Sequence, residues 1–267
     1  MDIFVAKVFK YGYRCERGAE RERNEDACLV ISSEFDGYFA MKPVGLYVVA
    51  DGMGGARDGH IASNTATRAF GEYVLSNIYF PLLREKPEPR EAAVLDVLER
   101  AGFAAHEAVQ QPDAAHAPSG SSGTTLTAGL ILGRRLFLAH VGDSRAYLLV
   151  DDELRPLTED HSLVRRLQEA GRLSEEDAQH FQYRNVLLQA VGRDSALTAD
   201  TFSLDLPDTG KLLLCSDGLC GLVSLEEIAG IMLGPDNPQA IADRLYEAAM
   251  VAGGHDNITA VVVDFSF

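Results

Sequence analysis

Four aspartates lie at the borders of apolar stretches that have the character of β-strands. They are Asp51 in VVADGMGG, Asp143 in AHVGDSRAY, Asp217 in LLLCSDGL and Asp256 in GGHDNITAVVV. A fifth acidic element, Asn24-Glu25-Asp26, comes before another apolar stretch. Hard divalent cations prefer sites where several carboxylate oxygens converge on one point, and strand ends are stiff platforms whose turns can add backbone carbonyls. The spacing therefore predicts a metal site assembled from segments far apart in the sequence.

A single Asp-Gly pair is weak evidence, because aspartate and glycine are also the residues that tight turns require. Here Asp51-Gly52, Asp217-Gly218 and Asp256-Asn257 all border strongly apolar strands. Carboxylates buried at such borders cost free energy unless something compensates their charge. A bound cation is the simplest compensation, so the joint pattern favours a metal site over three independent turns.

The segment Asp51-Gly52-Met53-Gly54-Gly55 has the composition of a ligand-binding turn. Glycine lets the backbone approach a ligand closely and adopt positive φ angles. Asp51 could therefore bridge two cations while the carbonyl of Gly52 coordinates one of them. The alternative is a flexible turn before a helix, and the apolar strand ahead of Asp51 favours the site.

The chain has 267 residues, of which 46% are hydrophobic and 24% are charged, and this composition is typical of a globular protein with a substantial core. We predict one domain over residues 1–267, because nothing marks a second core. The sequence has no apolar stretch of about 18 residues, which argues against a transmembrane helix. Its first residues lack the layout of a signal peptide, so we expect a cytoplasmic protein.

The formal net charge is −16, with an isoelectric point near 4.8. Proteins that bind nucleic acids or anionic membranes present basic patches, so the acidity argues against both partners. The negative charge could serve solubility, or some of the carboxylates could bind cations. The two explanations are compatible. The four cysteines form no CxxC pair and lie mostly beside apolar stretches, which predicts buried free thiols.

The apolar patterns predict strands and helices in clusters rather than in regular alternation. Strands are predicted at residues 3–10, 27–32, 45–50, 124–132, 136–140, 144–150, 211–215 and 258–265. Helices are predicted at residues 61–80 and 91–110, after Ser224, and from Pro238 to Gly253, with a helical insertion near 160–192. This order predicts an α+β protein with layered antiparallel sheets and helices on the outside.

Six segments resemble, in order, the motifs of the PPM (type 2C) metal-dependent protein Ser/Thr phosphatases. They are Arg21-x-x-Asn24-Glu25-Asp26, Asp51-Gly52-Met53-Gly54-Gly55, Ser122-Gly123-Thr124-Thr125, Val141-Gly142-Asp143-Ser144-Arg145-Ala146-Tyr147, Ser216-Asp217-Gly218-Leu219 and His255-Asp256-Asn257-Ile258-Thr259. They cover nearly the whole chain, from about residue 11 to residue 265. The methionine in DGMGG and the segment Leu157–Val164 are similar to the bacterial branch of the family.

The resemblance implies a central β-sandwich of two antiparallel sheets flanked by helices, in four layers (αββα), with a metal-containing cleft at one end. It implies two Mn²⁺ or Mg²⁺ ions and a possible third. Asp51 would bridge two ions, the Gly52 carbonyl would bind the first, and Asp217 and Asp256 would bind the second. Asp143, with help from Asp217, would bind the third. Residues 158–192 fall where the family carries a mobile flap beside the active site.

The resemblance also implies three residues for the reaction itself. Glu25 and Asp26 would hold metal-bound waters, and Arg21 would grip the substrate phosphate through charge-assisted hydrogen bonds. Two neighbouring cations can lower the pKa of a bridging water and stabilise an in-line displacement at phosphorus. Arg17 and Arg23 are alternatives to Arg21 as the phosphate ligand.

The sequence departs from the family's pattern directly after Asp51-Gly52. Many members carry a histidine there that is thought to protonate the leaving alkoxide, but Met53 cannot donate a proton. The general acid is therefore unassigned, and a metal-bound water is the simplest candidate. Ala56 replaces another histidine common in bacterial members, and we expect packing or surface roles for His60 and His255.

We therefore predict hydrolysis of phosphoserine and phosphothreonine in proteins by a metal-activated water in a binuclear centre, opposing a bacterial Ser/Thr protein kinase. The partners would be phosphorylated proteins, including that kinase and its substrates. A phosphoprotein-binding regulatory pseudophosphatase is one alternative, but intact Asp51, Asp217 and Asp256 argue against it. A phosphoesterase for small molecules is the other, and it would need a small closed pocket.

Overall fold

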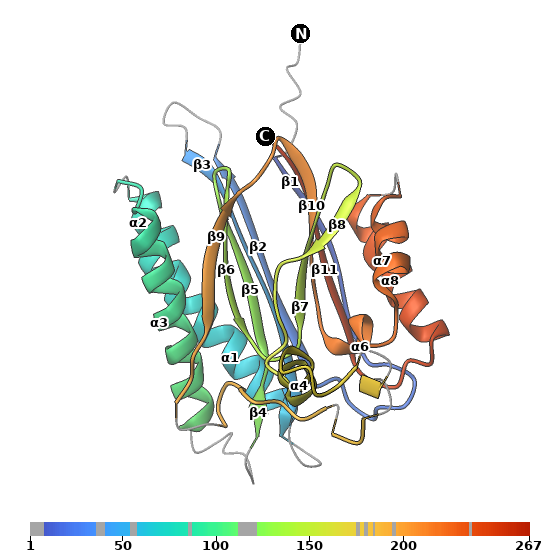
Figure 1. Cartoon of the computed structure of the whole chain (residues 1–267). Helices are drawn as coiled ribbons and strands as arrows, with labels where there is room; N and C mark the ends of the chain where they lie inside the picture. The colour runs from blue at the N-terminus through green and yellow to red at the C-terminus, as the bar shows by residue number, and fades with distance from the viewer. Residues whose placement is uncertain are drawn as a thin grey trace.

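The computed structural model describes residues 8–35, 41–53, 58–84, 87–111, 122–174, 177–178, 181–183, 185–193, 196–234 and 237–267. Within them, two antiparallel sheets pack face to face (Figure 1). The five-stranded sheet has the order β1 (Phe9–Glu16), β11 (Ile258–Ser266), β10 (Thr209–Cys215), β7 (Arg145–Val150) and β8 (Glu153–Pro156). The six-stranded sheet has the order β2 (Asp26–Phe35), β3 (Met41–Met53), β5 (Leu126–Leu132), β6 (Arg135–Val141) and β9 (Asp200–Asp205), with β4 (Gly123–Thr124) paired to β3.

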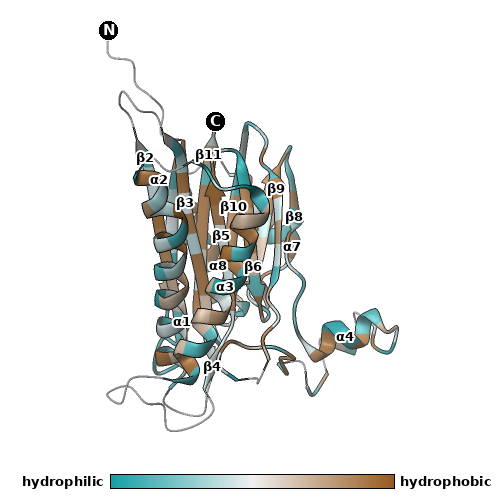
Figure 2. Ribbon diagram, turned by 90° about the vertical axis from the view of Figure 1, so that its left-hand side faces the viewer, coloured by the Kyte–Doolittle hydropathy of each residue, from teal (hydrophilic) through white to brown (hydrophobic). Residues whose placement is uncertain are grey.

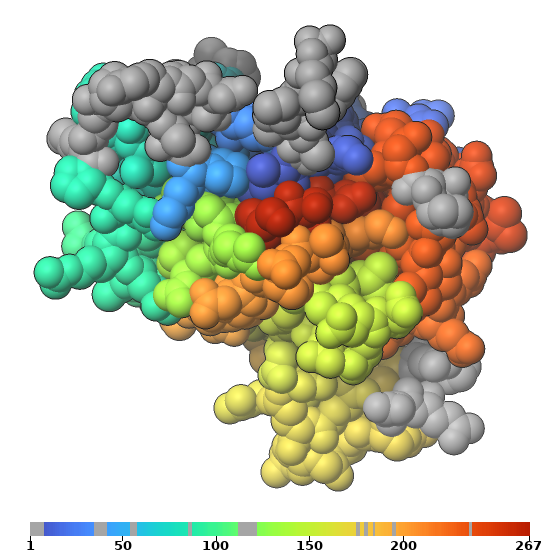
Figure 3. Space-filling model, turned by 90° about the horizontal axis from the view of Figure 1, so that it is seen from above, coloured from blue at the N-terminus to red at the C-terminus, as the bar shows by residue number. Residues whose placement is uncertain are grey.

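Helices cover the outer face of each sheet. The six-stranded sheet is covered by α1 (Gly59–Val74), a π-helical turn at Leu75–Tyr79, α2 (Phe80–Leu83) and α3 (Glu91–Gln110). The five-stranded sheet is covered by α7 (Leu225–Met232) and α8 (Pro238–Val251), with the short α6 (Asp217–Cys220) near its lower end. Figure 3 looks down on the sandwich and places the two helical layers on opposite sides of the strand ends. The predicted four-layer αββα sandwich is therefore confirmed.

Most strands are buried on both faces, which explains why they are apolar along almost their whole length. Tyr47, Leu136 and Val261 belong to the core between the sheets. Phe70 of α1 packs in the core above the six-stranded sheet, and Leu245 of α8 packs in the core above the five-stranded sheet. Figure 2 shows the apolar strands enclosed by helices with hydrophilic outer residues. The sheets thus form a rigid frame for the side chains at their lower ends.

The strongly periodic segments form the predicted elements. The helix predicted at 91–110 is α3, and the predicted hairpin is β5 and β6, which pair in antiparallel register. The two predicted helix N-termini are confirmed. At the start of α7 the Ser224 hydroxyl accepts a hydrogen bond from the backbone N–H of Glu227 at 3.2 Å, and Pro238 is the first residue of α8.

Two predictions are refined by the structure. The sequence predicts a helical insertion near 160–192; the described part of this segment contains α4 (Leu163–Glu169) and helical residues 177–178, and its other residues lie in turns, bends, isolated bridges and irregular structure. None of the residues of α4 is buried and the helix projects from the sandwich (Figure 2), so tertiary packing does not impose a helical period there. The strand predicted at 3–10 is displaced, since β1 runs from Phe9 to Glu16; residues 3–7 lie outside the described part of the chain.

In the described ranges, no helix combines the length and the apolar composition needed to cross a membrane. All four cysteines are free thiols. Cys215 is buried, but Cys15, Cys28 and Cys220 are partly exposed, so the expectation of buried thiols is right for Cys215 alone.

Candidate metal centre

Asp26 and Asp51 face one another as register partners where β2 begins and β3 ends. The backbone of Asp51 is fixed from the neighbouring strands: its N–H donates to the Thr125 hydroxyl at 2.9 Å, and its carbonyl accepts from the Thr125 N–H at 2.9 Å and the Thr124 hydroxyl at 2.8 Å. Three hydrogen bonds to the main chain leave the Asp51 carboxylate free for other partners.

Asp26 joins the two sheets of the sandwich. Its Oδ2 accepts hydrogen bonds from the Ser216 and Thr259 hydroxyls, each at 2.7 Å, and both donors follow or belong to strands of the opposite sheet. Its Oδ1 is buried and has no hydrogen-bond partner. Burial raises the pKa of Asp26 to about 8, because the charged carboxylate is removed from water.

Asp217 and Asp143 extend this acidic cluster. Asp217 begins α6, and its Oδ1 is buried without a hydrogen-bond partner. Burial is the main cause that raises the pKa of Asp51 well above its usual value, and the charges of Asp26, Asp217 and Asp143 add to it. Burial, followed by the charge of Asp217, also raises the pKa of Asp143 to about 8. The carboxylates are therefore close enough to oppose one another's ionisation.

Arg21 is the arginine of the N-terminal loop that reaches an acidic residue of the predicted site. Its Nη2 donates to Asp256 Oδ2 at 2.6 Å. Arg17 instead donates to a backbone carbonyl in its own loop, and Arg23 lies 3.2 Å from the ring nitrogens of His60. The geometry thus favours Arg21 over the two alternatives as the cation beside the carboxylates.

Asn257 positions the loop that carries Glu25, a role that its sequence motif does not indicate. Its amide nitrogen donates to the carbonyl of Arg23 at 2.9 Å, and its amide oxygen accepts from the N–H of Glu25 at 2.8 Å. The Glu25 carbonyl in turn accepts from the N–H of Gly52 at 3.1 Å and the hydroxyl of Ser63 at 2.5 Å. An asparagine can donate and accept at once, which explains why the residue after Asp256 is an amide.

Two glycines of the predicted motifs are required by close backbone packing. A Cβ on Gly52 would lie 2.1 Å from the carbonyl oxygen of Gly59 and 2.5 Å from that of Glu25. A Cβ on Gly218 would lie 1.9 Å from the carbonyl oxygen of Asn257. Larger residues would separate the segments that bring the carboxylates together.

The donors in this cluster suit a hard divalent cation. Among the described residues, no three His, Cys, Asp or Glu side chains are arranged closely enough to ligate one ion as they lie here. However, the unpartnered oxygens of Asp26 and Asp217 are buried anionic donors, and oxygen ligands are those that Mg²⁺ and Mn²⁺ prefer. A cation between the carboxylates would also remove the repulsion that raises their pKa values.

Several other predicted positions lie near the cluster without joining it. The Met53 sulfur lies 3.6 Å from Nη1 of Arg193, an exposed cation that sequence analysis missed because no motif links residues so far apart. His255 Nδ1 lies 2.8 Å from Glu20 at the surface, as expected. Residues 54–57, which include Gly54, Gly55 and Ala56, lie outside the described part of the chain.

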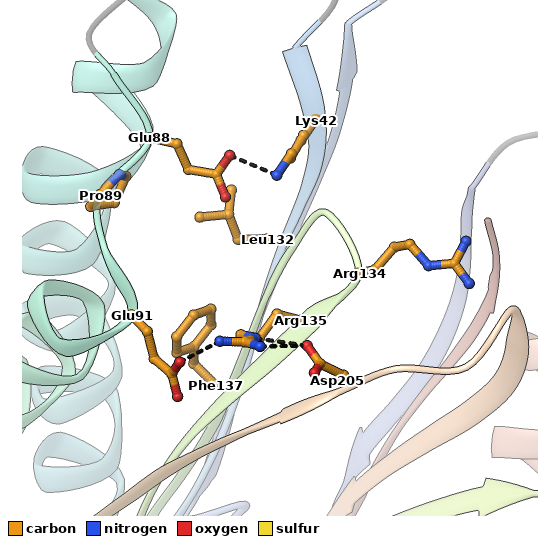
Figure 4. Close-up of a pocket in the computed structure, with 9 residues that line it drawn as sticks. All are labelled: Lys42, Glu88, Pro89, Glu91, Leu132, Arg134, Arg135, Phe137 and Asp205. Carbon is orange, nitrogen blue, oxygen red and sulfur yellow. Dashed lines mark hydrogen bonds and ion pairs between the residues drawn. The ribbon is translucent and has the colours of Figure 1, made fainter.

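A cavity of about 290 Å³ lies at the other end of the sandwich, where β3 and α3 begin and β5 turns into β6 (Figure 4). Its charged side chains are paired: Lys42 Nζ lies 2.7 Å from Glu88, Arg135 bridges Glu91 and Asp205, and Arg134 pairs with Asp208 outside the cavity. These cations are already neutralised, so the predicted chemistry belongs to the carboxylate cluster and not to this cavity.

Comparisons with known proteins agree with this architecture. A sequence model of the family Protein phosphatase 2C matches residues 17–243. The serine/threonine phosphatase stp of Listeria welshimeri is 35% identical over 252 residues, 94% of each chain. The serine/threonine protein phosphatase PstP of Mycobacterium tuberculosis is 36% identical over 263 residues, which cover 97% of this chain and 46% of PstP. A crystal structure of the PstP catalytic domain with two manganese ions has a TM-score of 0.77 at 33% identity, covering 97% of this chain and 99% of that one. The chain belongs to the protein phosphatase 2C family.

Proposed function

We propose that this protein is a Mn²⁺- or Mg²⁺-dependent protein phosphatase that hydrolyses phosphoserine and phosphothreonine. The observation that carries the proposal is the cluster of buried carboxylates, with unpartnered oxygens on Asp26 and Asp217, in a chain of the protein phosphatase 2C family. Relatives named serine/threonine phosphatases support the reaction, and the related structure with two manganese ions supports the choice of metal.

The residues that would hold the ions are those predicted from the sequence. Asp51, the carbonyl of Gly52, Asp217 and Asp256 would hold two ions, and Asp143 together with Asp217 would hold a third. When bound, the ions supply the Lewis acidity that makes water a nucleophile at neutral pH and offset the charge on the phosphoryl group.

The chain's own residues would orient the reactants. Asp26 is held between the two sheets, and its free oxygen together with Glu25 would accept hydrogen bonds from water and align it with phosphorus. Arg21 would bind the phosphate oxygens through parallel N–H···O bonds. Met53 has no proton to donate, so the leaving alkoxide would take its proton from water.

The partners in this proposal are phosphorylated proteins, including a Ser/Thr protein kinase and its substrates, in the cytoplasm. Residues 1–267 would act as one domain, and residues 158–192 would act as a flap over the substrate. In support, α4 lies at the end of the sandwich that holds the carboxylates and projects from the body of the protein (Figures 1 and 2).

The test compares hydrolysis of p-nitrophenyl phosphate and a phosphothreonine peptide with Mn²⁺ and with EDTA. Wild type is expected to turn over both with Mn²⁺ alone, and Asp217→Ala is expected to lose turnover. Asp96→Asn is the matched control, because Asp96 is an exposed aspartate on α3 that pairs only with its own helix. No turnover by folded wild type with any divalent ion would instead favour a phosphoprotein-binding role, and turnover of the small ester alone would favour a phosphoesterase for small molecules.

A further inference from the structure

Arg193 is an exposed arginine beside the carboxylate cluster, and the reaction proposed above does not use it. Its Nη1 lies 3.6 Å from the Met53 sulfur. A thioether is a weak acceptor and an arginine has five N–H donors, so most of the guanidinium remains open. Among the described residues, no carboxylate pairs with Arg193. In a chain with a formal net charge of −16, this cation is available to an anion from outside the chain.

The backbone at Arg193 is fixed by neighbouring elements. Two backbone hydrogen bonds, at 2.8 and 3.0 Å, tie Val191 to Thr124 of β4. The Gly192 N–H donates to Nδ1 of His106 on α3 at 3.0 Å. The turn that carries Arg193 is therefore attached to both β4 and α3.

The side chain of Arg193 reaches Met53 by passing over Gly123. A Cβ on Gly123 would overlap Cγ of Arg193 and would lie 2.6 Å from its Cδ, so the aliphatic stem packs against the bare backbone of Gly123. Gly123 is the register partner of Met53 in the pairing of β3 with β4. The stem thus extends across β4 to the end of β3, where the guanidinium meets the Met53 sulfur.

Met53 and Asp51 lie on the same face of β3. Side chains alternate along a strand, and the burial of β3 agrees, because Asp51 and Met53 are partly exposed while Gly52 between them is buried. At about 3.3 Å per residue, Met53 is about 7 Å beyond Asp51 along the strand. The guanidinium of Arg193 therefore lies on the face of β3 that carries the Asp51 carboxylate.

Arg21 approaches the carboxylates from a different side. It belongs to the loop before β2 and pairs with Asp256, whereas Arg193 reaches them over β4. Because β2 and β4 both pair with β3, the two arginines come from the two neighbours of the strand that carries Asp51. An extended peptide spans about 7 Å in two residues. A side chain near the phosphorylated residue is thus within reach of Arg193 while Arg21 is beside the phosphate.

We propose that Arg193 binds the carboxylate of an acidic residue near the phosphorylated residue, and that this phosphatase therefore prefers phosphopeptides with aspartate or glutamate at that place. The inference rests on the proposed function, because it names the class of phosphoprotein that the site would accept. Guanidinium and carboxylate match in planar, bidentate geometry. The paired carboxylate keeps its charge throughout the reaction, so the contact stabilises the bound substrate and the transition state alike.

The test compares phosphothreonine peptides that carry either glutamate or glutamine at one position, placed in turn at each of the three positions before and after the phosphothreonine. With Mn²⁺, wild type is expected to hydrolyse the glutamate peptide with a kcat/KM about 3–10-fold higher at one or more positions. This range lies between the effects of an exposed ion pair and of a charge-assisted hydrogen bond. The difference is expected in KM and not in kcat, because the contact does not change in the transition state.

Three variants assign the preference to its residue. Arg193→Ala is expected to bring the ratio of kcat/KM between the two peptides to about one, and Arg193→Glu is expected to favour the glutamine peptide, since like charges repel. The control is Arg100→Ala, which removes an exposed arginine of α3 that pairs with Asp96 of the same helix. This control is expected to keep the wild-type ratio.

Phosphonate analogues of the same peptides, in which a CH₂ group replaces the bridging oxygen, resist hydrolysis and give Kd values by fluorescence anisotropy. If wild type hydrolyses none of the peptides, the proposed function fails, and the ratio of Kd values still tests Arg193. Equal Kd and kcat/KM for glutamate and glutamine at every position would overturn the proposal, and so would a preference that persists in Arg193→Ala. Equal losses by Arg193→Ala on both peptides and on p-nitrophenyl phosphate would assign Arg193 to the phosphate instead, which also overturns it.

Discussion

The guanidinium of Arg21 donates a hydrogen bond of 2.6 Å from Nη2 to Oδ2 of Asp256, joining residues 235 positions apart in the chain. The pair brings a cation from the N-terminal loop to the carboxylate that precedes β11. This hydrogen bond is the largest cause that raises the pKa of Arg21, and the charges of Asp51 and Glu25 act in the same direction. Arg21 is thus held beside the acidic cluster before any substrate arrives.

The first prediction concerns this arginine. Arg21→Ala is expected to lower kcat/KM for a phosphothreonine peptide by about 10–100-fold, because charge-assisted hydrogen bonds are each worth about 1.5–3 kcal/mol. Arg21→Lys is expected to recover part of the loss, since it keeps the charge but not the paired geometry. The control is Arg17→Ala, whose guanidinium turns to the Glu22 carbonyl. Equal losses from both alanine variants would contradict the assignment.

The second prediction concerns metal removal. Excess Mn²⁺ at about 100 times its Kd is expected to stabilise wild type by about 2.7 kcal/mol, or roughly 5–10 °C in Tm, relative to EDTA. Asp217→Asn removes one of the opposed buried carboxylates, so in EDTA it is expected to be at least as stable as wild type while gaining little from Mn²⁺. Thermal unfolding of both proteins, each with Mn²⁺ and with EDTA, measures the shift in Tm that Mn²⁺ causes in each. An unchanged Mn²⁺ shift in Asp217→Asn would exclude Asp217 as a ligand.

The third prediction tests whether Thr259 positions the Asp26 carboxylate for turnover without being needed for folding. Thr259→Val removes one of the two hydroxyls that bind Asp26 Oδ2, and we expect turnover to fall by about 10–100-fold, as for other residues that orient a metal site. Thr259→Ser keeps the hydroxyl and is expected to stay close to wild type. Kinetics of both variants, with circular dichroism as the check on folding, measure the effect; comparable activities would mean that Ser216 alone orients Asp26.

The sequence predicts the local parts of this structure better than the contacts between them. The helix at 91–110 and the β5–β6 hairpin follow from short-range apolar periods and turn residues. The hydrogen bond between Arg21 and Asp256 depends on how β1 and β11 pair, which no local pattern encodes. A family resemblance can name the acidic residues, but the orientation of Glu25 by Asn257 becomes visible only once the chain is folded.

The segment after β8 shows that local sequence patterns can also predict more regular structure than the chain forms. Its polar, helix-favouring residues predict helices, yet α4 has no buried residue and most of its described neighbours lie in turns, bends, isolated bridges or irregular structure. Helix propensity without a face to bury is a weak determinant of structure. What fixes this segment is its attachment to the sandwich, which the next prediction tests.

The fourth prediction concerns the ion pair at the root of this segment. Arg145 Nε and Nη2 donate to Asp160 Oδ1 and Oδ2, both at 2.7 Å, and Asp160 is the more buried partner. Asp160→Asn is expected to cost about 1–3 kcal/mol in unfolding free energy, because a partly buried guanidinium loses its charged partner. Urea denaturation measures the loss. Glu169→Gln is the control: it breaks an exposed i,i+4 contact with Arg165 that is worth about 0.3–0.5 kcal/mol. Similar losses in both variants would argue against a special role for the Arg145 pair.

The last prediction concerns acid stability and the buried His140. Its Nε2 lies 3.0 Å from the carbonyl of Glu159, to which it must donate, and its Nδ1 lies 3.0 Å from the Thr127 hydroxyl. Burial lowers the pKa of His140 to about 4, and the ring of His161, at a centroid distance of 4.9 Å, adds to the effect. The folded chain therefore binds the proton less readily than the unfolded chain, in which a histidine has a pKa of about 6.5.

Because protonation favours the unfolded chain, the stability associated with neutral His140 is fully present above pH 6.5 and is lost as the pH falls through about 4. The loss is expected to reach about 3 kcal/mol in unfolding free energy. His140→Gln keeps a donor for the Glu159 carbonyl but cannot titrate, so its stability is expected to fall less between pH 6.5 and pH 4. Subtracting the unfolding free energy of His140→Gln from that of wild type at each pH cancels the titration of the carboxylate cluster, which both proteins share. Parallel stability curves for wild type and His140→Gln would show that His140 is not buried in its neutral form.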